Sequence, residues 1–223
     1  MLVRQAWLPL PERKPLLVYY KHYQPVRPKW EFIGRRSKAR CEYENYAVFK
    51  RLGIPAPERV AIGEERDILG RLLRTFIVTR AVPNAMTLTE FVEKHCPHRR
   101  TLEMRKLRFA ICRRLAELTR RMHDAGFFHR DLVWRNVLVT WLPPSPPELW
   151  WIDCPRGRFT HRTFLRGIRR LRDLASLGKS AVRWCTAGER IHFMRIYLGK
   201  DHLDSEAKAL ILREMEYRKK RWP

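Results

Sequence analysis

The chain has 223 residues, 45% of them hydrophobic, and a formal net charge of +24 at pH 7. This hydrophobic fraction excludes an intrinsically disordered chain, and the length suits one domain, built as one lobe or two. The charge predicts an anionic partner: nucleic acid, an anionic membrane surface or a phosphorylated substrate. Composition alone does not rank these three.

Five cysteines are widely spaced and form no C-x-x-C pair: Cys41, Cys96, Cys112, Cys154 and Cys185. This spacing argues against a disulfide framework or a zinc site and favours a reducing cytoplasm. The first residues lack the apolar core and the small-residue cleavage site of a signal peptide. No apolar run is long enough to span a bilayer. We therefore expect a cytoplasmic protein whose contact with a membrane is peripheral.

The first predicted elements are a strand and a helix. Residues 16–23 form a β-rich run bounded by prolines, which is typical of a strand. Residues 37–52 have the pattern of a helix, with Ser37 as its N-cap and Gly53 just beyond its end.

Two more strands and a short helix follow. The strands are expected around 58–62 and 73–79, and residues 81–84 are a plausible hinge. Thr87 is expected to cap a short helix over 88–94.

The second half of the chain is predicted to be mostly helical. Residues 102–125 give the strongest helix signal, because one apolar stripe repeats at spacings of three and four: Leu107, Ile111, Leu115, Leu118 and Met122. Two strand-like runs, 137–139 and 149–152, are joined by a proline-rich turn. Beyond Asp153 we expect helices, with breaks near three glycines: Gly178, Gly188 and Gly199.

Residues 129–136 read His-Arg-Asp-Leu-Val-Trp-Arg-Asn, which matches the H-R-D-L-x-x-x-N pattern of a protein-kinase catalytic loop. In that loop the aspartate accepts the proton of the attacking hydroxyl, and the asparagine holds a magnesium ion. Asp131 is thus the candidate catalytic base and Asn136 a candidate metal ligand. A solvated loop aspartate and a turn-forming asparagine are the alternatives, and the fixed spacing favours function. His129 and Arg130 are expected to be architectural.

Asp153 ends the second strand-like run, where a kinase keeps its other magnesium ligand. Magnesium takes few protein ligands, so one carboxylate and one amide oxygen suffice. The alternative is an aspartate that caps a turn. The residues that follow are Cys154 to Gly157, and not the Phe-Gly of protein kinases.

Lys21 is the candidate contact for the nucleotide phosphates. If the strand alternates, Lys21 shares a face with apolar neighbours, which suggests that it points into a cleft. The alternative is an edge-strand lysine that prevents aggregation. Glu42 is the expected partner that orients Lys21, and Glu44 is its competitor on the same predicted helix.

Arginines crowd the segment after Asp153: Arg156, Arg158, Arg162, Arg166, Arg169, Arg170 and Arg172. Guanidinium groups bind phosphate and carboxylate in a bidentate manner, so the cluster suits an anionic acceptor. A solvated basic helix face is an equally good interpretation. The glycine-rich hairpin that normally covers the phosphates is missing, since the first glycine is Gly34. The head of the first helix, at 35–37, is an alternative phosphate cover.

Several of these stretches resemble the lipopolysaccharide kinase family of the Kdo/WaaP type: residues 18–21, 42–57, 122–131, 151–157 and 172–177. The resemblance runs over most of the chain, from about residue 15 to about residue 200. It implies an α+β, protein-kinase-like fold of two lobes. The β-rich N-lobe, complete or truncated, would span 1–80, the hinge 81–84 and the mostly helical C-lobe 85–223.

The resemblance also implies an activity. Family members use ATP and Mg²⁺ to phosphorylate Kdo or heptose in the lipopolysaccharide inner core, at the cytoplasmic face of the inner membrane. By this resemblance Asp131 is the catalytic aspartate, Asn136 and Asp153 hold metal, and Lys21 contacts ATP. The expected partners are a lipid-linked anionic sugar and the anionic membrane surface, with no specific nucleic acid.

Two other functions stay open. The same fold can phosphorylate a protein or a soluble small molecule, and a degenerate kinase-like chain can act as a basic binding module. The intact set of Asp131, Asn136 and Asp153 argues against the binding module, which has no need of all three.

Overall fold

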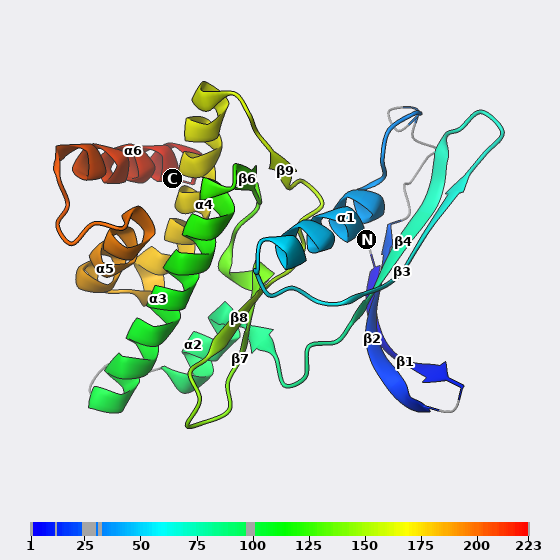
Figure 1. Ribbon diagram of the computed structural model, residues 1–223, viewed down its shortest axis with the longest axis horizontal. Helices are drawn as coiled ribbons and strands as arrows, with labels where there is room; N and C mark the ends of the chain where they lie inside the picture. The colour runs from blue at the N-terminus through cyan, green and yellow to red at the C-terminus, as the bar shows by residue number, and fades with distance from the viewer. Residues whose placement is uncertain (1, 12, 24–29, 31–32, 97–100, 223) are drawn as a thin grey trace. The chain divides into compact units, whose positions relative to one another are not determined.

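The computed structural model describes residues 2–11, 13–23, 30, 33–96 and 101–222 (Figure 1). Its contacts divide the chain into two compact units. The first, here called the sheet unit, comprises residues 1–83 and 153–157, and the second, the helical unit, comprises 84–152 and 158–223. A five-residue piece of chain therefore packs with the sheet unit although its neighbours on both sides belong to the helical unit.

The described residues of the sheet unit form one antiparallel sheet of four strands in the order β1-β2-β4-β3. The strands are β1 (Leu2–Leu10), β2 (Arg13–Tyr23), β3 (Arg59–Arg66) and β4 (Leu72–Arg80). The three strands expected from the sequence are present. The edge strand β1 was not expected, because almost all its side chains are exposed on both faces and it has no alternation of buried residues.

Helix α1 (Lys38–Arg51) packs against β3 and β4 of this sheet (Figure 1). Ser37 is its N-cap, as expected, and its hydroxyl accepts a hydrogen bond from the Arg40 N–H at 3.1 Å. Gly53 follows the last turn with a φ of +63°, the left-handed conformation that glycine adopts freely. The buried face of α1 is partly polar and includes Glu42, Asn45, Tyr46 and Phe49.

Among the residues that the structure describes, five helices build most of the helical unit (Figure 1). They are α2 (Leu88–His95), α3 (Leu102–Asp124), α4 (Thr163–Trp184), α5 (Ala187–Leu198) and α6 (Ser205–Arg221). Thr87 caps α2, as the sequence predicts, and it forms a capping box with Glu90. The expected stripe of α3 is buried at Ile111, Leu115, Leu118 and Met122. Helix α5 packs on α3, and α6 packs on α4.

Two small antiparallel sheets complete the helical unit. One joins β5 (Met86–Thr87), β7 (Val137–Thr140) and β8 (Glu148–Trp151), and the other joins β6 (Phe127–Phe128) and β9 (Arg158–Phe159). The short 3-10 turn η2 (Trp134–Asn136) precedes β7.

The expected helix break at Gly178 is wrong. Helix α4 continues through Gly178, and a Cβ atom on that residue would overlap Glu214 Oε1 of α6. The glycine allows two helices to approach closely instead of ending one. Gly188 lies in the first turn of α5, just after a break, and Gly199 ends α5 with a φ of +65°, as expected. No helix in the described part of the chain is long and apolar enough to cross a membrane.

Candidate active site

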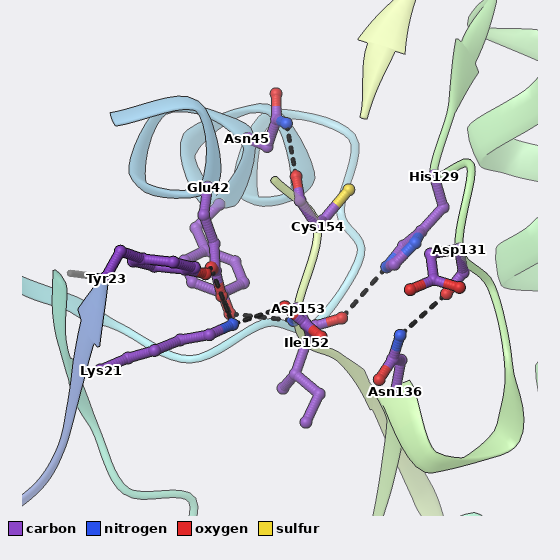
Figure 2. A network of polar contacts seen from close by, with 11 residues as sticks. Lys21, Tyr23, Glu42, Asn45, His129, Asp131, Asn136, Ile152, Asp153 and Cys154 are labelled. Carbon is purple, nitrogen blue, oxygen red and sulfur yellow. Dashed lines mark hydrogen bonds and ion pairs between the residues drawn. The ribbon is translucent and has the colours of Figure 1, made fainter. Parts of the chain in front are cut away.

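In the sheet unit, Lys21 of β2 contacts two carboxylates (Figure 2). Its Nζ donates to Glu42 Oε1 at 3.2 Å, to Glu42 Oε2 at 3.0 Å and to Asp153 Oδ1 at 2.5 Å. Glu42 is the buried partner of the lysine, with 2% of its side chain exposed. Its competitor Glu44 lies at the surface, where it pairs with Arg36. The structure therefore brings together three of the residues singled out in the sequence.

Two tyrosines complete the surroundings of Glu42. The hydroxyl of Tyr23 donates to Glu42 Oε2 at 2.8 Å, and the hydroxyl of Tyr46 donates to Glu42 Oε1 at 2.8 Å. Strand alternation places Tyr23 on the same face of β2 as Lys21. Helical spacing places Tyr46 one turn beyond Glu42. Neither tyrosine was recognised from the sequence as part of this network, although the spacing of 21 to 23 and 42 to 46 was the available signal.

The positive charge of Lys21 is stabilised by the neighbouring carboxylates of Glu42 and Asp153. Burial lowers the pKa of Lys21, but the nearby carboxylates of Glu42 and Asp153 outweigh this effect and raise the pKa above its usual value. The lysine is therefore a cation at neutral pH. Burial, followed by the charge of Glu42, raises the pKa of Tyr23 and of Tyr46, so both hydroxyls keep their protons.

The Asp153–Gly157 segment is bound to α1 by hydrogen bonds. The Asp153 N–H donates to the Tyr46 hydroxyl at 3.2 Å, and Asp153 has a φ of +54°. Asn45 Nδ2 donates to the Cys154 carbonyl at 2.7 Å and to the Gly157 carbonyl at 3.0 Å. The Asp153 side chain remains 32% exposed, so its carboxylate is open to a ligand.

In the helical unit, hydrogen bonds define the loop that carries Asp131 (Figure 2). The Asn136 side-chain amide donates to the Asp131 carbonyl at 2.9 Å, which turns its amide oxygen away from that carbonyl. His129 Nε2 donates to the Ile152 carbonyl at 3.1 Å, and the Ile152 N–H donates to the Asn136 carbonyl at 3.0 Å. The two ends of the candidate loop are thus both tied to the residue that precedes Asp153.

Asp173 of α4 binds the backbone of this loop, and sequence reasoning did not identify it as a site residue. It is fully buried, and its two carboxylate oxygens accept the N–H groups of His129 and Arg130, each at 2.8 Å. His123 Nε2 lies 3.3 Å from Asp173 Oδ2, and its Nδ1 lies 2.7 Å from the Tyr197 hydroxyl. These contacts hold the backbone where Arg130 adopts a φ of +67°, one residue before Asp131. The signal in the sequence that could have identified Asp173 is that it is the one acidic residue of the arginine-rich helix α4.

Six of the seven clustered arginines divide into two sets, and the seventh, Arg172, is half-buried. The inner set is half-buried and binds its own unit: Arg166 donates to the Asp124 carbonyl at 3.1 Å, Arg169 to the Thr160 hydroxyl, and Arg170 lies 3.7 Å from Asp124 Oδ1. The outer set is exposed and consists of Arg156, Arg158 and Arg162. Only the outer set therefore has the exposure that binding an anionic acceptor requires.

A hairpin does precede the lysine, but it contains no glycine. Strand β1 pairs with β2, with Val3 opposite Lys21. Ser37, considered above as a phosphate contact, is fully buried and uses its hydroxyl to cap α1. Its side chain is therefore not available to a phosphate group.

The residues present fit magnesium, although no cluster of three His, Cys, Asp or Glu side chains that could hold a metal occurs among the described residues. Magnesium binds through one or two protein oxygens together with substrate phosphates and water. Within the sheet unit, Asp153 offers a part-exposed carboxylate. Within the helical unit, Asn136 offers an amide oxygen. Lys21 supplies a cation beside that carboxylate, where a phosphate group requires one.

The antiparallel sheet with its packed helix and the mostly helical second unit are typical of a kinase-like fold. Residues 26–197 match the model of the Lipopolysaccharide kinase (Kdo/WaaP) family. The chain belongs to the lipopolysaccharide kinase family, as its resemblance to that family predicted.

The fold is shared with a solved structure described as "WaaP in complex with acyl carrier protein". The two chains are 24% identical with a TM-score of 0.69, over 93% of this chain and 81% of that chain. The predicted kinase-like α+β fold is therefore confirmed. No curated protein matches this chain.

Proposed function

We propose that this protein transfers the γ-phosphoryl group of ATP to a hydroxyl group of an inner-core lipopolysaccharide sugar, Kdo or heptose. The observation that carries the proposal is the hydrogen-bonded set of Lys21, Glu42 and Asp153 in a chain of the lipopolysaccharide kinase family. Lys21 binds the nucleotide phosphates, and Glu42 holds the lysine in place. Asp153 and Asn136 bind magnesium, which neutralises phosphate charge when bound.

Asp131 is the proposed catalytic base. It accepts the proton of the acceptor hydroxyl as that oxygen attacks the phosphorus atom. The loop bonds from Asn136 and Asp173 keep its backbone in one conformation, which reduces the entropy lost on reaching the reactive geometry.

The outer arginines are the proposed contacts for the acceptor. Inner-core sugars carry carboxylate and phosphate groups, and guanidinium binds both in a bidentate manner. Arg156, Arg158 and Arg162 are exposed and lie in the segment that follows Asp153 in the chain. The net charge of +24 favours attachment to an anionic bilayer surface, so we place the protein at the cytoplasmic face of the inner membrane.

The direct test is a transfer assay with radiolabelled ATP, magnesium and purified lipopolysaccharide core acceptors. We expect label on the core sugar with the wild-type protein. Asp131→Asn should lower kcat at least about 100-fold, the usual loss for a general base, with ATP affinity little changed. Near-normal turnover in Asp131→Asn contradicts the assignment of the base. Label on a protein or a soluble small molecule, and not on the core, contradicts the acceptor.

We also propose acyl carrier protein as a partner, because one cavity of the helical unit favours it. The cavity has a volume of about 320 Å³ and lies among helices α2 to α6, with apolar residues such as Val92, Leu115, Trp134, Leu177, Met194 and Ile211. The similar solved structure is itself a complex with acyl carrier protein. An acyl chain suits such a cavity, since each buried CH₂ contributes about 0.8 kcal/mol.

Calorimetry with acylated and unacylated acyl carrier protein tests this partner. We expect the acylated form to bind more tightly, and Ala181→Trp, which fills the cavity wall, to remove the difference. Equal affinity for the two forms contradicts the acyl-chain site. No binding of either form contradicts the partner.

A further inference from the structure

We propose that Asn45 and Tyr46 are positioning residues that hold the Asp153–Gly157 segment in its metal-binding conformation. The proposal rests on the kinase function proposed above and assigns two residues to the magnesium side of that site. Both lie about one turn beyond Glu42 on the same face of α1, and both are buried, with 7% of Asn45 and 5% of Tyr46 exposed.

Tyr46 links the lysine partner to the metal carboxylate. Its hydroxyl donates to Glu42 Oε1 at 2.8 Å and accepts the Asp153 N–H at 3.2 Å. Asp153 has a φ of +54°, a conformation that a residue with a Cβ atom rarely adopts without support. One hydroxyl therefore stabilises an unfavourable backbone conformation that directs the Asp153 carboxylate toward Lys21 (Figure 2).

Asn45 binds the part of the segment that follows Asp153. Its single Nδ2 atom donates to the Cys154 carbonyl at 2.7 Å and to the Gly157 carbonyl at 3.0 Å. A carboxamide nitrogen has two hydrogens and can join two carbonyl groups in this way, whereas a carboxylate of the same size can join none. Asn45 thus fixes the turn that follows Asp153.

The residue that follows Asp153 has a small side chain. In protein kinases the residue after the metal aspartate is a phenylalanine, whose packing sets the active or inactive state. Here that residue is Cys154, a small side chain that is fully buried. Because Glu42, Asn45 and Tyr46 share one helix face, any displacement of α1 would release Lys21 and Asp153 together.

A matched pair of variants isolates the Tyr46 contact. Tyr46→Phe and Tyr23→Phe each remove one hydroxyl that donates to Glu42 at 2.8 Å, but only Tyr46 also accepts from Asp153. The difference between the two variants therefore measures the Asp153 link.

Three measurements apply to both variants: Mg²⁺-ATP and metal-free ATP binding by calorimetry, the KM for Mg²⁺, and hydrogen–deuterium exchange of the peptide spanning 149–158. Tyr46→Phe should weaken Mg²⁺-ATP binding relative to Tyr23→Phe by a few-fold to about tenfold, the range for one hydrogen bond. It should also raise the KM for Mg²⁺ more than it lowers kcat, and exchange at Asp153 should become faster. Equal values in the two variants overturn the role of Tyr46.

Asn45→Asp tests the second residue, since it keeps the size of the side chain and removes both N–H groups. We expect faster exchange at residues 154–157 and weaker Mg²⁺-ATP binding, with an intact thermal transition as evidence that the chain folds. Unchanged exchange and metal affinity overturn the role of Asn45. Both roles are judged by binding and exchange. A wild-type protein that binds Mg²⁺-ATP but phosphorylates no core acceptor therefore contradicts the proposed acceptor alone.

Discussion

At the scale of single residues, Asp153 combines two roles. It pairs with Lys21 at 2.5 Å, and it keeps 32% of its side chain exposed for a ligand. A carboxylate that serves only as a structural partner of a lysine does not need that exposure. The balance between these two roles can be measured with nucleotide alone.

We expect Asp153→Ala to weaken binding of Mg²⁺-ATP much more than binding of metal-free ATP, because the metal loses a ligand while Lys21 still contacts the phosphates. Calorimetry with and without magnesium measures both affinities. An equal loss for the two forms of ATP would show that Asp153 is a structural residue.

Tyr46 gives a prediction for pH. Burial and the charge of Glu42 raise its pKa well above the usual 10.0, so the folded state keeps a proton that the unfolded state loses above pH 10. This contribution to stability is complete below pH 10 and falls as the pH rises, by about 1.4 kcal/mol per pH unit. Urea unfolding of wild type and Tyr46→Phe from pH 9 to 11.5 should give a smaller decline for the variant. Parallel declines would contradict a buried, protonated Tyr46.

At the scale of elements, the sequence predicted those helices and strands whose ends or faces follow local rules. Ser37 and Thr87 cap α1 and α2 as expected, and the apolar stripe of α3 is buried. Strand β1 was not predictable, since it is exposed on both faces and pairs only along one edge with β2. Gly178 was misread because its small size serves packing against α6, which no local pattern reveals.

The candidate site was predictable for a related reason. Asp131, Asn136 and Asp153 occupy fixed spacings or strand ends, and Lys21 and Glu42 each share a face with apolar residues, so sequence rules reach them. Asp173 was not identified, because its partners His129 and Arg130 are more than 40 positions away and donate only backbone N–H groups. Every residue except proline has a backbone N–H group, so a backbone hydrogen bond does not require a particular residue type and gives no signal in the sequence.

Two glycines of α4 make a matched test of helix packing. A Cβ atom on Gly167 would have nothing within 4 Å, whereas one on Gly178 would overlap Glu214 Oε1. Gly167→Ala should stabilise the protein by about 0.5–1 kcal/mol through helix propensity. Gly178→Ala should gain less, and Gly178→Leu should destabilise by about 1–3 kcal/mol through overpacking against α6. Thermal unfolding of the three variants measures the order, and a Gly178→Leu variant as stable as the wild type would contradict close α4–α6 contact.

At the scale of the whole molecule, the net charge of +24 attracts any anionic surface, and this general attraction has to be distinguished from binding at a specific acceptor site. General attraction to an anionic surface depends on total charge, whereas an acceptor site depends on where the charges lie. The exposed Arg158 and Arg162 belong to the proposed acceptor set, and the exposed Arg213 and Lys219 on α6 do not.

Reversing each pair to glutamate changes the total charge by the same amount. We expect Arg158→Glu/Arg162→Glu to raise the acceptor KM, with ATP affinity retained, and Arg213→Glu/Lys219→Glu to have a much smaller effect. The difference should shrink at high salt, where the Debye length falls to about 3 Å at 1 M. Equal effects of the two pairs would favour general attraction. Loss of nucleic-acid affinity with unchanged acceptor kinetics would favour nucleic acid as the partner of this surface.

The five residues 153–157 also limit how the protein can be divided. They belong to the sheet unit by their contacts, yet they are encoded some 70 positions after the rest of it. A fragment that stops at Pro83 would retain Lys21 and Glu42 but lack the Asp153 carboxylate and the carbonyl groups that Asn45 binds. When the two units are expressed separately, we therefore expect neither of them to be soluble. A synthetic peptide spanning 149–158 is the natural reagent for restoring the sheet unit by fragment complementation.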